Sequence, residues 1–140
     1  MLERIGAREA KRRMDEDGWI YLDVRSVPEF EQGHPNGAYN VPLLHLASGG
    51  MATNEGFVAA VIRVFDPATK IVVGCQSGVR SVRAAELLLE AGFQSIAEQR
   101  AGFGGARGPF GERVEAGWLD EGLPTSTEAA TGRSWAELGG

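Results

Sequence analysis

The sequence predicts an α/β domain with a mostly parallel central sheet flanked by helices. Short runs of branched and aromatic residues alternate along the chain with segments of helical periodicity. The run KIVVG (70–74) is almost continuously apolar, which is typical of a parallel strand buried on both faces. A clear helix, SVRAAELLLEAGF (81–93), begins a few residues later. In such a sheet a ligand binds at the carboxyl ends of the strands, so residues 75–80 are the first place to look for a site.

The N-terminal segment predicts a helix followed by a strand. In GAREAKRRMDEDG (6–18), small and apolar residues recur at helical spacing and Gly18 provides a stop. The residues expected on the inner face of this helix are Ala7, Ala10 and Met14. WIYLDV (19–24) then has the aromatic and branched residues of a strand.

A capped helix, a tight turn and a short strand are expected next. Ser26 and Glu29 stand at the two positions of a capping box, which predicts a brief helix. GHPNG (33–37) has the residues of a tight turn, because proline, asparagine and glycine each suit a turn for a separate backbone reason. AYNVPL (38–43) is expected to be a short strand that ends at Pro42.

The middle of the chain predicts a surface loop and a helix before the apolar strand. HLASGGMATNEG (45–56) is glycine-rich and is expected to be a loop, whereas GFVAAVIRVFD (56–66) has apolar residues at helical spacing. In the later helix, Gly92 is expected to adopt the left-handed cap conformation. The inner stripe predicted for that helix consists of Val82, Ala85, Leu88 and Leu89.

The C-terminal part predicts one more strand and a glycine-rich loop. SIAEQ (95–99) is expected to be a weaker last strand, and the five glycines between 102 and 111 argue against regular structure where AGFGGARGPFGERVEAG begins. WLDEGLP (118–124) is expected to be the last segment that packs against the core. We expect one domain over residues 1–124 and a tail, 125–140, that carries a short helix around Trp135 or is loosely held.

The composition indicates a cytoplasmic, soluble protein. The net charge of −5 and the absence of a long basic run give no footprint for nucleic acid. No stretch approaches the about 20 apolar residues of a membrane helix, and the N-terminus lacks the apolar region of a secretory signal. One cysteine cannot form an internal disulfide, and no cysteine–histidine spacing suggests zinc. We therefore expect no metal, no organic cofactor, and no nucleic-acid or membrane partner.

The single cysteine, Cys75, lies in the turn between the apolar strand and its helix. Backbone N–H groups and the positive end of the helix dipole converge at such a turn and favour negative charge. A thiol there becomes a thiolate more easily. Gly78 permits a tight curl, and Arg80 has the charge to hold an anionic substrate. The alternative is that Cys75 is a small buried hydrophobic residue, as free cysteines often are.

Three motifs in order resemble a single-domain rhodanese, a sulfurtransferase. They are LDVRSVPEFEQGHPNGAYNVPL, VVGCQSGVRSVRAAELLLEAGF and the later GG…W…GLP. The resemblance implies a three-layer fold and a catalytic Cys75, which accepts the outer sulfur of thiosulfate or a similar anionic donor. The resulting persulfide passes its sulfur to cyanide, a thiol or a protein acceptor. The substrate-binding residues that it implies are Gln76, Ser77, Gly78, Val79, Arg80 and Arg25.

The chain departs from the family pattern at two places. The turn reads GHPNGA rather than the usual GHIPGA, and ARGPFGERVEAG separates Gly104-Gly105 from Trp118. The longer loop can shape the mouth of the pocket or contact a partner, and it leaves the donor undecided. Arg25 is expected either to contact the anion or to form a strand-end salt bridge. Ser77 either places its hydroxyl against the sulfur or favours the turn.

Other polar and aromatic residues are expected to be structural. Arg83 is interpreted as a solvated helix residue, and the two histidines, His34 and His45, stand near no ligand motif. Trp118 and Phe103 are expected to pack in the core.

Two other functions remain open at this point. Cysteine-dependent phosphatases also use a cysteine cradle with an arginine, but they place five residues between the two; here only residues 76–79 intervene. A phosphate ester or arsenate activity is therefore disfavoured. The other alternative is a rhodanese-like module that acts by binding, or a persulfide carrier dedicated to a partner protein. The presence of both Cys75 and Arg80 argues against an inactive module.

Overall fold

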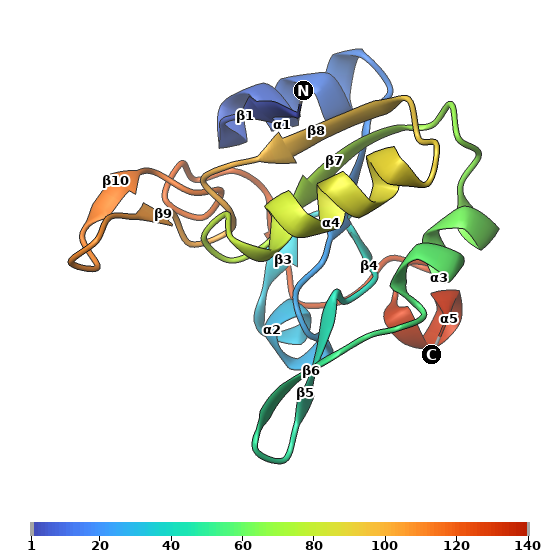
Figure 1. Cartoon of the computed structure of the whole chain (residues 1–140). Helices are drawn as coiled ribbons and strands as arrows, with labels where there is room; N and C mark the ends of the chain where they lie inside the picture. Colours follow the sequence, from blue (N-terminus) through green and yellow to red (C-terminus); the bar gives the residue numbers. More distant parts are fainter. Residues whose placement is uncertain (1, 140) are drawn as a thin grey trace.

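The computed structural model describes residues 2–139 and has a five-stranded, entirely parallel central sheet in the order β1-β8-β7-β2-β4 (Figure 1). The strands are β1 (Glu3–Ile5), β2 (Ile20–Asp23), β4 (Tyr39–Asn40), β7 (Lys70–Gly74) and β8 (Ser95–Gln99). This confirms the predicted α/β class, with KIVVG in the middle of the sheet. β1 was not predicted: two charged residues followed by one apolar residue are too short a pattern to distinguish from a loop.

Helices cover both faces of the sheet. α1 (Ala7–Glu16) and α2 (Val27–Gln32) contribute buried residues to a cluster on one face. The other face is covered by α3 (Phe57–Val64), α4 (Arg80–Glu90) and α5 (Trp135–Leu138), which share a second cluster. The molecule therefore has the three layers expected of the fold.

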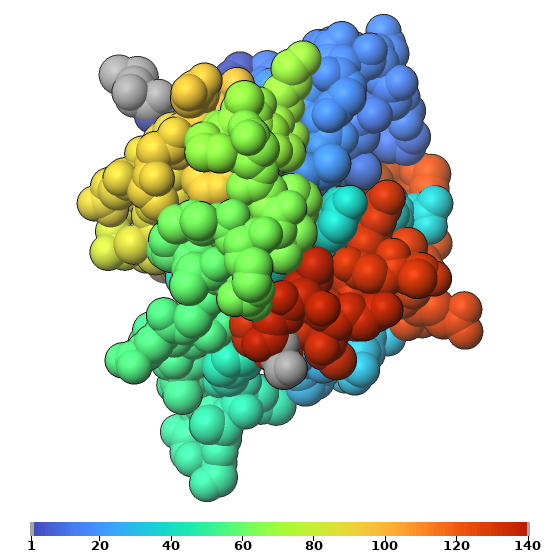
Figure 2. All heavy atoms as spheres, turned by 90° about the vertical axis from the view of Figure 1, so that its right-hand side faces the viewer, coloured from blue at the N-terminus to red at the C-terminus, as the bar shows by residue number. Residues whose placement is uncertain are grey.

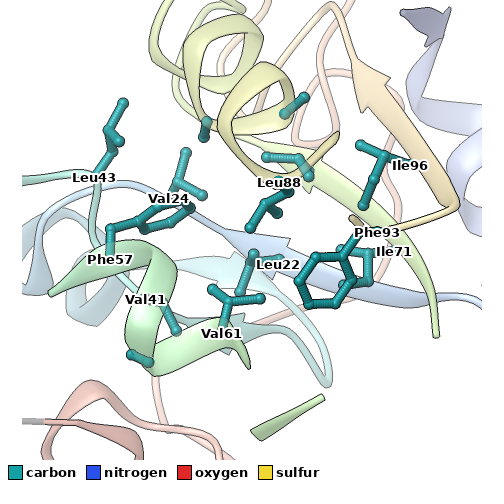
Figure 3. Close-up of a cluster of buried hydrophobic side chains, with 14 of the residues drawn as sticks. Leu22, Val24, Val41, Leu43, Phe57, Val61, Ile71, Leu88, Phe93 and Ile96 are labelled. Atoms are coloured by element: carbon teal, nitrogen blue, oxygen red, sulfur yellow. The ribbon is translucent and has the colours of Figure 1, made fainter. Parts of the chain in front are cut away.

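Alternation along the strands divides the core into these two clusters. In β7, Ile71 and Val73 point to the α3–α4 side, whereas Val72 points to the α1–α2 side. Figure 3 shows the larger cluster, where Leu22 and Ile71 of the sheet face Val61 of α3 and Leu88 of α4. Because side chains of a strand alternate with a period of two, a central parallel strand must be apolar at every position.

The buried stripe of α4 differs from the predicted one. Ala85 and Leu88 are buried as expected, but Leu89 is 36% exposed and Val82 is only partly buried. The inner positions are instead Ser81, Ala84, Ala85 and Leu88. The inner face is therefore shifted by about one residue from the predicted one, and it places Ser81 of the first turn against the buried Cys75. Gly92 has the expected left-handed conformation, with φ of +103°.

Two segments predicted as loops are hairpins. The predicted loop 45–56 overlaps the antiparallel pair β5 (Leu44–Ala47) and β6 (Gly50–Thr53), which projects from the body in Figure 1. The glycine-rich region contains a second pair, β9 (Ala106–Arg107) and β10 (Arg113–Glu115). Glycines at the turns, among them Gly49 and Gly111 with positive φ, allow both hairpins. Glycine count alone did not distinguish an open loop from a hairpin turn.

The C-terminal segment lies against the main body of the molecule. Leu138 of α5 is buried in the larger core cluster, and its carbonyl accepts a hydrogen bond from Arg63 of α3 at 2.8 Å. Figure 2 shows this segment seated beside the α3 region. A further short pair joins β3 (His34–Pro35) to β11 (Thr125–Ser126). The division into residues 1–124 and a tail remains a prediction. Within residues 2–139, no helix is long and apolar enough to cross a membrane.

Candidate active site

Cys75 lies directly after β7, at the carboxyl end of the sheet, and its side chain is buried, with 1% of its surface exposed. The Gly78 N–H donates a hydrogen bond to Cys75 Sγ at 3.2 Å. The 11-residue helix α4 begins at Arg80, so the positive end of its dipole lies near the loop. The loop therefore presents a backbone donor and a helix N-terminus to the same sulfur.

The glycine-rich segment after β8 packs its backbone against the Cys75 loop. Phe103 N–H donates to the Cys75 carbonyl at 2.8 Å, and Gly104 N–H donates to the Gln76 carbonyl at 2.9 Å. A Cβ atom on Gly102 would lie 2.4 Å from the Gln76 carbonyl oxygen. A Cβ on Gly78 would lie 2.1 Å from the Arg100 carbonyl oxygen. Glycine is required here because two backbone segments are in contact, a reason that composition alone did not reveal.

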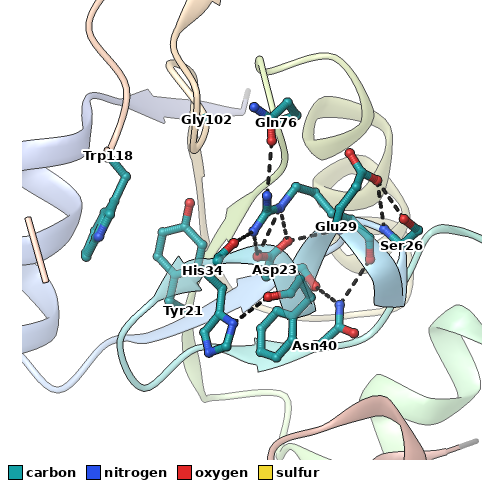
Figure 4. A network of polar contacts seen from close by, with 12 residues as sticks. Tyr21, Asp23, Ser26, Glu29, His34, Asn40, Gln76, Gly102 and Trp118 are labelled. Carbon is teal, nitrogen blue, oxygen red and sulfur yellow. Dashed lines mark hydrogen bonds and ion pairs between the residues drawn. The ribbon is translucent and has the colours of Figure 1, made fainter. Parts of the chain in front are cut away.

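Arg25 is a buried clamp between three segments, two of which carry Asp23 and Gln76, labelled in Figure 4. Its guanidinium donates to the Asp23 carboxylate, with Nη2–Oδ2 at 2.7 Å, and to the Gly33 carbonyl at 2.7 Å. Nη1 also donates to Gln76 Oε1 at 3.0 Å. Burial disfavours the charged guanidinium, but the Asp23 carboxylate outweighs it and raises the pKa of Arg25 above its ordinary value. The strand-end salt bridge is thus present, and it extends to the active-site loop.

Arg80 is also paired with a carboxylate. Its two terminal nitrogens donate to the two oxygens of Glu29 at 2.7 and 2.9 Å. These hydrogen bonds, with those from Ser26, hold the pKa of Glu29 at about 2 despite partial burial. Unlike the Arg25 pair, this pair is partly open to solvent, with the Arg80 and Glu29 side chains 19% and 29% exposed. The capping box predicted from Ser26 and Glu29 is confirmed, and it also aims Glu29 at the loop.

A pocket of about 340 Å³ opens beside these groups. Its lining includes Arg25, Glu29, Gly33, Gln76 and Leu119. Cys75 is buried and does not line this pocket, whereas its neighbour Gln76 does. A small anion in the pocket would contact Arg25 and lie beside Glu29, the carboxylate partner of Arg80.

A polar group next to the sulfur was missed by the sequence analysis. The hydroxyl of Ser81 lies 3.3 Å from Cys75 Sγ and donates to the buried carboxylate of Glu98. Arg4 Nε donates to the other oxygen of Glu98 at 2.6 Å. The one available signal was a charged residue inside a predicted strand, SIAEQ, because a charged side chain is seldom buried unless it is paired. Its partners come from segments too far apart in the sequence to infer.

The remaining predicted residues divide into site and scaffold. Gln76 and Ser77 are partly buried in the loop, and Val79 is 75% exposed at its rim. Arg83 is exposed, as expected. His34 is buried and structural: its Nδ1 lies 2.7 Å from the Phe30 carbonyl oxygen and its ring stacks on Phe30. His45 is partly exposed near Trp135. Trp118 and Phe103 pack in the core as predicted.

No cluster of three or more potential metal-ligating side chains occurs in the part of the chain that the structure describes. The arrangement instead has a single nucleophilic atom, a backbone donor and two nearby guanidinium groups. Chemically, it suits attack by sulfur on an anionic substrate.

Comparisons with known proteins identify the family of the chain. The family described as "Rhodanese-like domain" matches residues 6–105. Thiosulfate sulfurtransferase 16, chloroplastic, of Arabidopsis thaliana is 40% identical over 77% of this chain and 80% of its own length. Thiosulfate sulfurtransferase 18 of the same plant is 33% identical over 81% of this chain and 76% of its own. Against some other plant relatives, the chain spans about half their length.

A solved structure has the same fold. The crystal structure of Rv0390 from M. tuberculosis superimposes with a TM-score of 0.73 at 28% sequence identity, over 91% of this chain and 98% of the other.

Proposed function

Because the chain belongs to the rhodanese-like domain family, we propose that it is a sulfurtransferase that carries sulfur as a persulfide on Cys75. The observation that supports this proposal most directly is the position of Cys75 Sγ at the end of β7, 3.2 Å from the Gly78 amide and next to the N-terminus of α4. Two relatives named thiosulfate sulfurtransferase favour thiosulfate as the donor class.

The proposed reaction has two balanced steps. The Cys75 thiolate attacks the outer sulfur of thiosulfate, a sulfur–sulfur bond forms, and the bond within thiosulfate breaks with its electron pair on sulfite. The enzyme is left with a Cys75 persulfide anion. Cyanide or a thiolate then attacks the outer sulfur and releases the Cys75 thiolate. The backbone amides of residues 76–80 and the α4 dipole would stabilise the negative sulfur in both steps.

The two arginines would have different roles. The Arg25–Asp23 pair is buried, so separating its charges would leave a group uncompensated in the core. We assign Arg25 to holding Gln76 and the loop in place. The Arg80–Glu29 pair is partly solvated and can exchange partners at lower cost. The donor anion would therefore bind to Arg80 by displacing Glu29.

The direct test is the mass of the intact protein after incubation with thiosulfate, followed by addition of cyanide and detection of thiocyanate. A gain of one sulfur that cyanide discharges is expected for the wild type. Cys75→Ser should fold but gain no sulfur, because the oxygen nucleophile is far weaker. The chain has a single cysteine, so any sulfur gained as a persulfide is on Cys75.

Failure of this test has two distinct forms. If the wild type gains no sulfur but Cys75 is still alkylated, the donor is another compound, such as mercaptopyruvate or a persulfide on a partner protein. If the thiol is also inert, the alternative of a non-enzymatic binding module is favoured instead.

A further inference from the structure

The side of Cys75 that faces α4 contains a hydrogen-bonded chain that the two proposed steps do not use. Cys75 Sγ lies 3.3 Å from Ser81 Oγ, and Ser81 donates to Glu98 Oε2. Glu98 Oε1 accepts from Arg4 Nε at 2.6 Å. Ser81 and Glu98 are both fully buried. The buried Glu98 carboxylate is therefore linked to the proposed nucleophile, Cys75 Sγ, by the single hydroxyl of Ser81.

Three neighbouring strands create this arrangement. β7, β8 and β1 are adjacent in the sheet, and Glu98 of β8 is paired with Val73 on one side and Arg4 on the other. Side chains two residues apart share a face, so Glu98 lies on the same face as Ile96, which packs in the cluster under α4. Ser81, in the first turn of α4, contacts both Glu98 and Cys75 from the helix that covers this face.

While Glu98 is charged, the hydroxyl hydrogen of Ser81 can point only toward the Glu98 carboxylate. A carboxylate only accepts, and the Ser81 hydroxyl has one hydrogen, which it donates to Glu98. Ser81 therefore turns a lone pair toward the sulfur. A lone pair accepts the hydrogen of a thiol, whereas it repels the negative charge of a thiolate. Arg4 supplies the counterion that a buried carboxylate requires.

Building on the proposed sulfur transfer, we propose that Ser81 is a further catalytic residue, that Glu98 positions its hydroxyl, and that together they hold the resting Cys75 as a thiol. A negative charge on Cys75 would be opposed by the negative charge of Glu98, because a single hydroxyl links the two groups. On the loop side, the Gly78 N–H remains the donor to the thiolate after the proton has left.

The proton can move within the same chain when the thiolate forms. The Cys75 hydrogen passes to Ser81 Oγ while the hydrogen of Ser81 passes to Glu98. The negative charge moves from the carboxylate to the sulfur, and the total charge of the three groups is unchanged. Ser81 then points its new hydrogen at the sulfur and becomes a donor to the thiolate.

Other titratable groups near Cys75 and Glu98 are the same residues in the wild type and in the Glu98→Gln variant that we compare below. Arg4 comes from β1, Arg80 from the start of α4, and Tyr21, Asp23 and Arg25 from β2 and its end. Arg80 and Arg25 have carboxylate partners other than Glu98. Arg4 is paired with Glu98 itself, so Glu98→Gln removes the negative charge and also leaves the half-exposed Arg4 guanidinium without this partner. Both changes favour a negative charge on Cys75.

The test is the pH dependence of Cys75 ionisation in the wild type and in Glu98→Gln. It is followed by the ultraviolet absorbance of the thiolate and by the rate of alkylation. Glutamine is neutral, and its amide can donate to Ser81, which frees the Ser81 hydrogen to point at the sulfur. The midpoint should fall by about one pH unit or more, because a nearby like charge has been removed. Glu86→Gln, an exposed carboxylate on the same helix, should leave the midpoint unchanged.

A midpoint that is unchanged or higher in Glu98→Gln would overturn the proposal and would leave Ser81 and Glu98 as a purely structural link. If that variant does not fold, the carboxyl resonance of Glu98 in ¹³C NMR provides a second measurement. It should shift as Cys75 ionises in the wild type and lose that response in Cys75→Ala. A carboxyl resonance that ignores Cys75 ionisation would equally reject the proposal. Neither measurement uses a sulfur donor, so each is independent of the proposed sulfur transfer.

Discussion

The charged groups on the pocket side of Cys75 differ from those on the α4 side in their exposure and in their partners. On the pocket side, two arginines have carboxylate partners, one pair buried and the other partly solvated. On the helix side, a fully buried carboxylate reaches the sulfur through the Ser81 hydroxyl. Exposure decides what each pair can do: a solvated pair can exchange its partner for a substrate anion, whereas a buried pair fixes structure or sets the ionisation of its neighbour.

The largest effect is expected where the buried pocket-side pair is broken. Asp23→Asn leaves the Arg25 guanidinium buried without a counterion and should destabilise the fold by about 3–5 kcal/mol. Asp15→Asn is the matched control, since Asp15 pairs with Lys11 on the exposed face of α1 and should cost less than about 1 kcal/mol. Urea unfolding of the two variants measures the difference. Equal costs would show that the Arg25 clamp is not under the electrostatic constraint described above.

The next largest loss of stability is expected at Gly78. This residue lies in the Cys75 loop, where the loop contacts the segment after β8. Gly78→Ala combines a left-handed backbone, φ +88°, with a Cβ placed 2.1 Å from the Arg100 carbonyl oxygen. Strain and overpacking together should cost about 2–4 kcal/mol and should displace the amide that donates to Cys75.

Gly111→Ala separates the two causes for Gly78. Gly111 has a similar φ of +80°, but nothing lies within 4 Å of its Cβ position. That variant should cost about 1 kcal/mol through backbone strain alone and should retain sulfur transfer. If thermal unfolding gives the same loss for both glycines, the close approach of the two loops is not what requires glycine at position 78.

The difference between the two sides also explains how far the sequence could predict this site. Cys75, Gly78, Arg80 and the Ser26–Glu29 capping box lie in short motifs, so their local geometry follows from spacing. The sheet was predictable because KIVVG and its helix have strong periodicity. In contrast, the contact of Glu98 with Ser81 and Arg4 joins three segments whose proximity depends on strand order, and β1 was itself too short to predict. That Arg80 is occupied by Glu29 also depended on how α2 is oriented against the loop.

A smaller effect is expected when the solvated arginine is removed. Arg80→Ala should raise the KM for thiosulfate about tenfold, equivalent to about 1.4 kcal/mol, with a smaller change in kcat. Arg83→Ala removes the same charge three residues further along α4, where the side chain is exposed, and should leave KM unchanged. Glu29→Gln should lower KM, because the donor no longer has to displace a carboxylate. Steady-state kinetics in which Arg80→Ala and Arg83→Ala behave alike would contradict the assigned role of Arg80.

The smallest effect concerns the acid stability of the Arg80–Glu29 pair. Hydrogen bonds from Arg80 and Ser26 lower the pKa of Glu29 from 4.5 to about 2. Because the folded-state pKa is depressed, the stabilisation is fully present above pH 4.5 and is lost as the pH falls toward 2. Partial exposure screens the pair, so the loss should be about 1 kcal/mol. Glu29→Gln has no carboxylate to protonate and should lose correspondingly less stability over this range. Urea unfolding at pH 6 and pH 3 compares the two proteins, and a wild type that loses no more stability than Glu29→Gln would show that the pair contributes to donor binding and not to the fold.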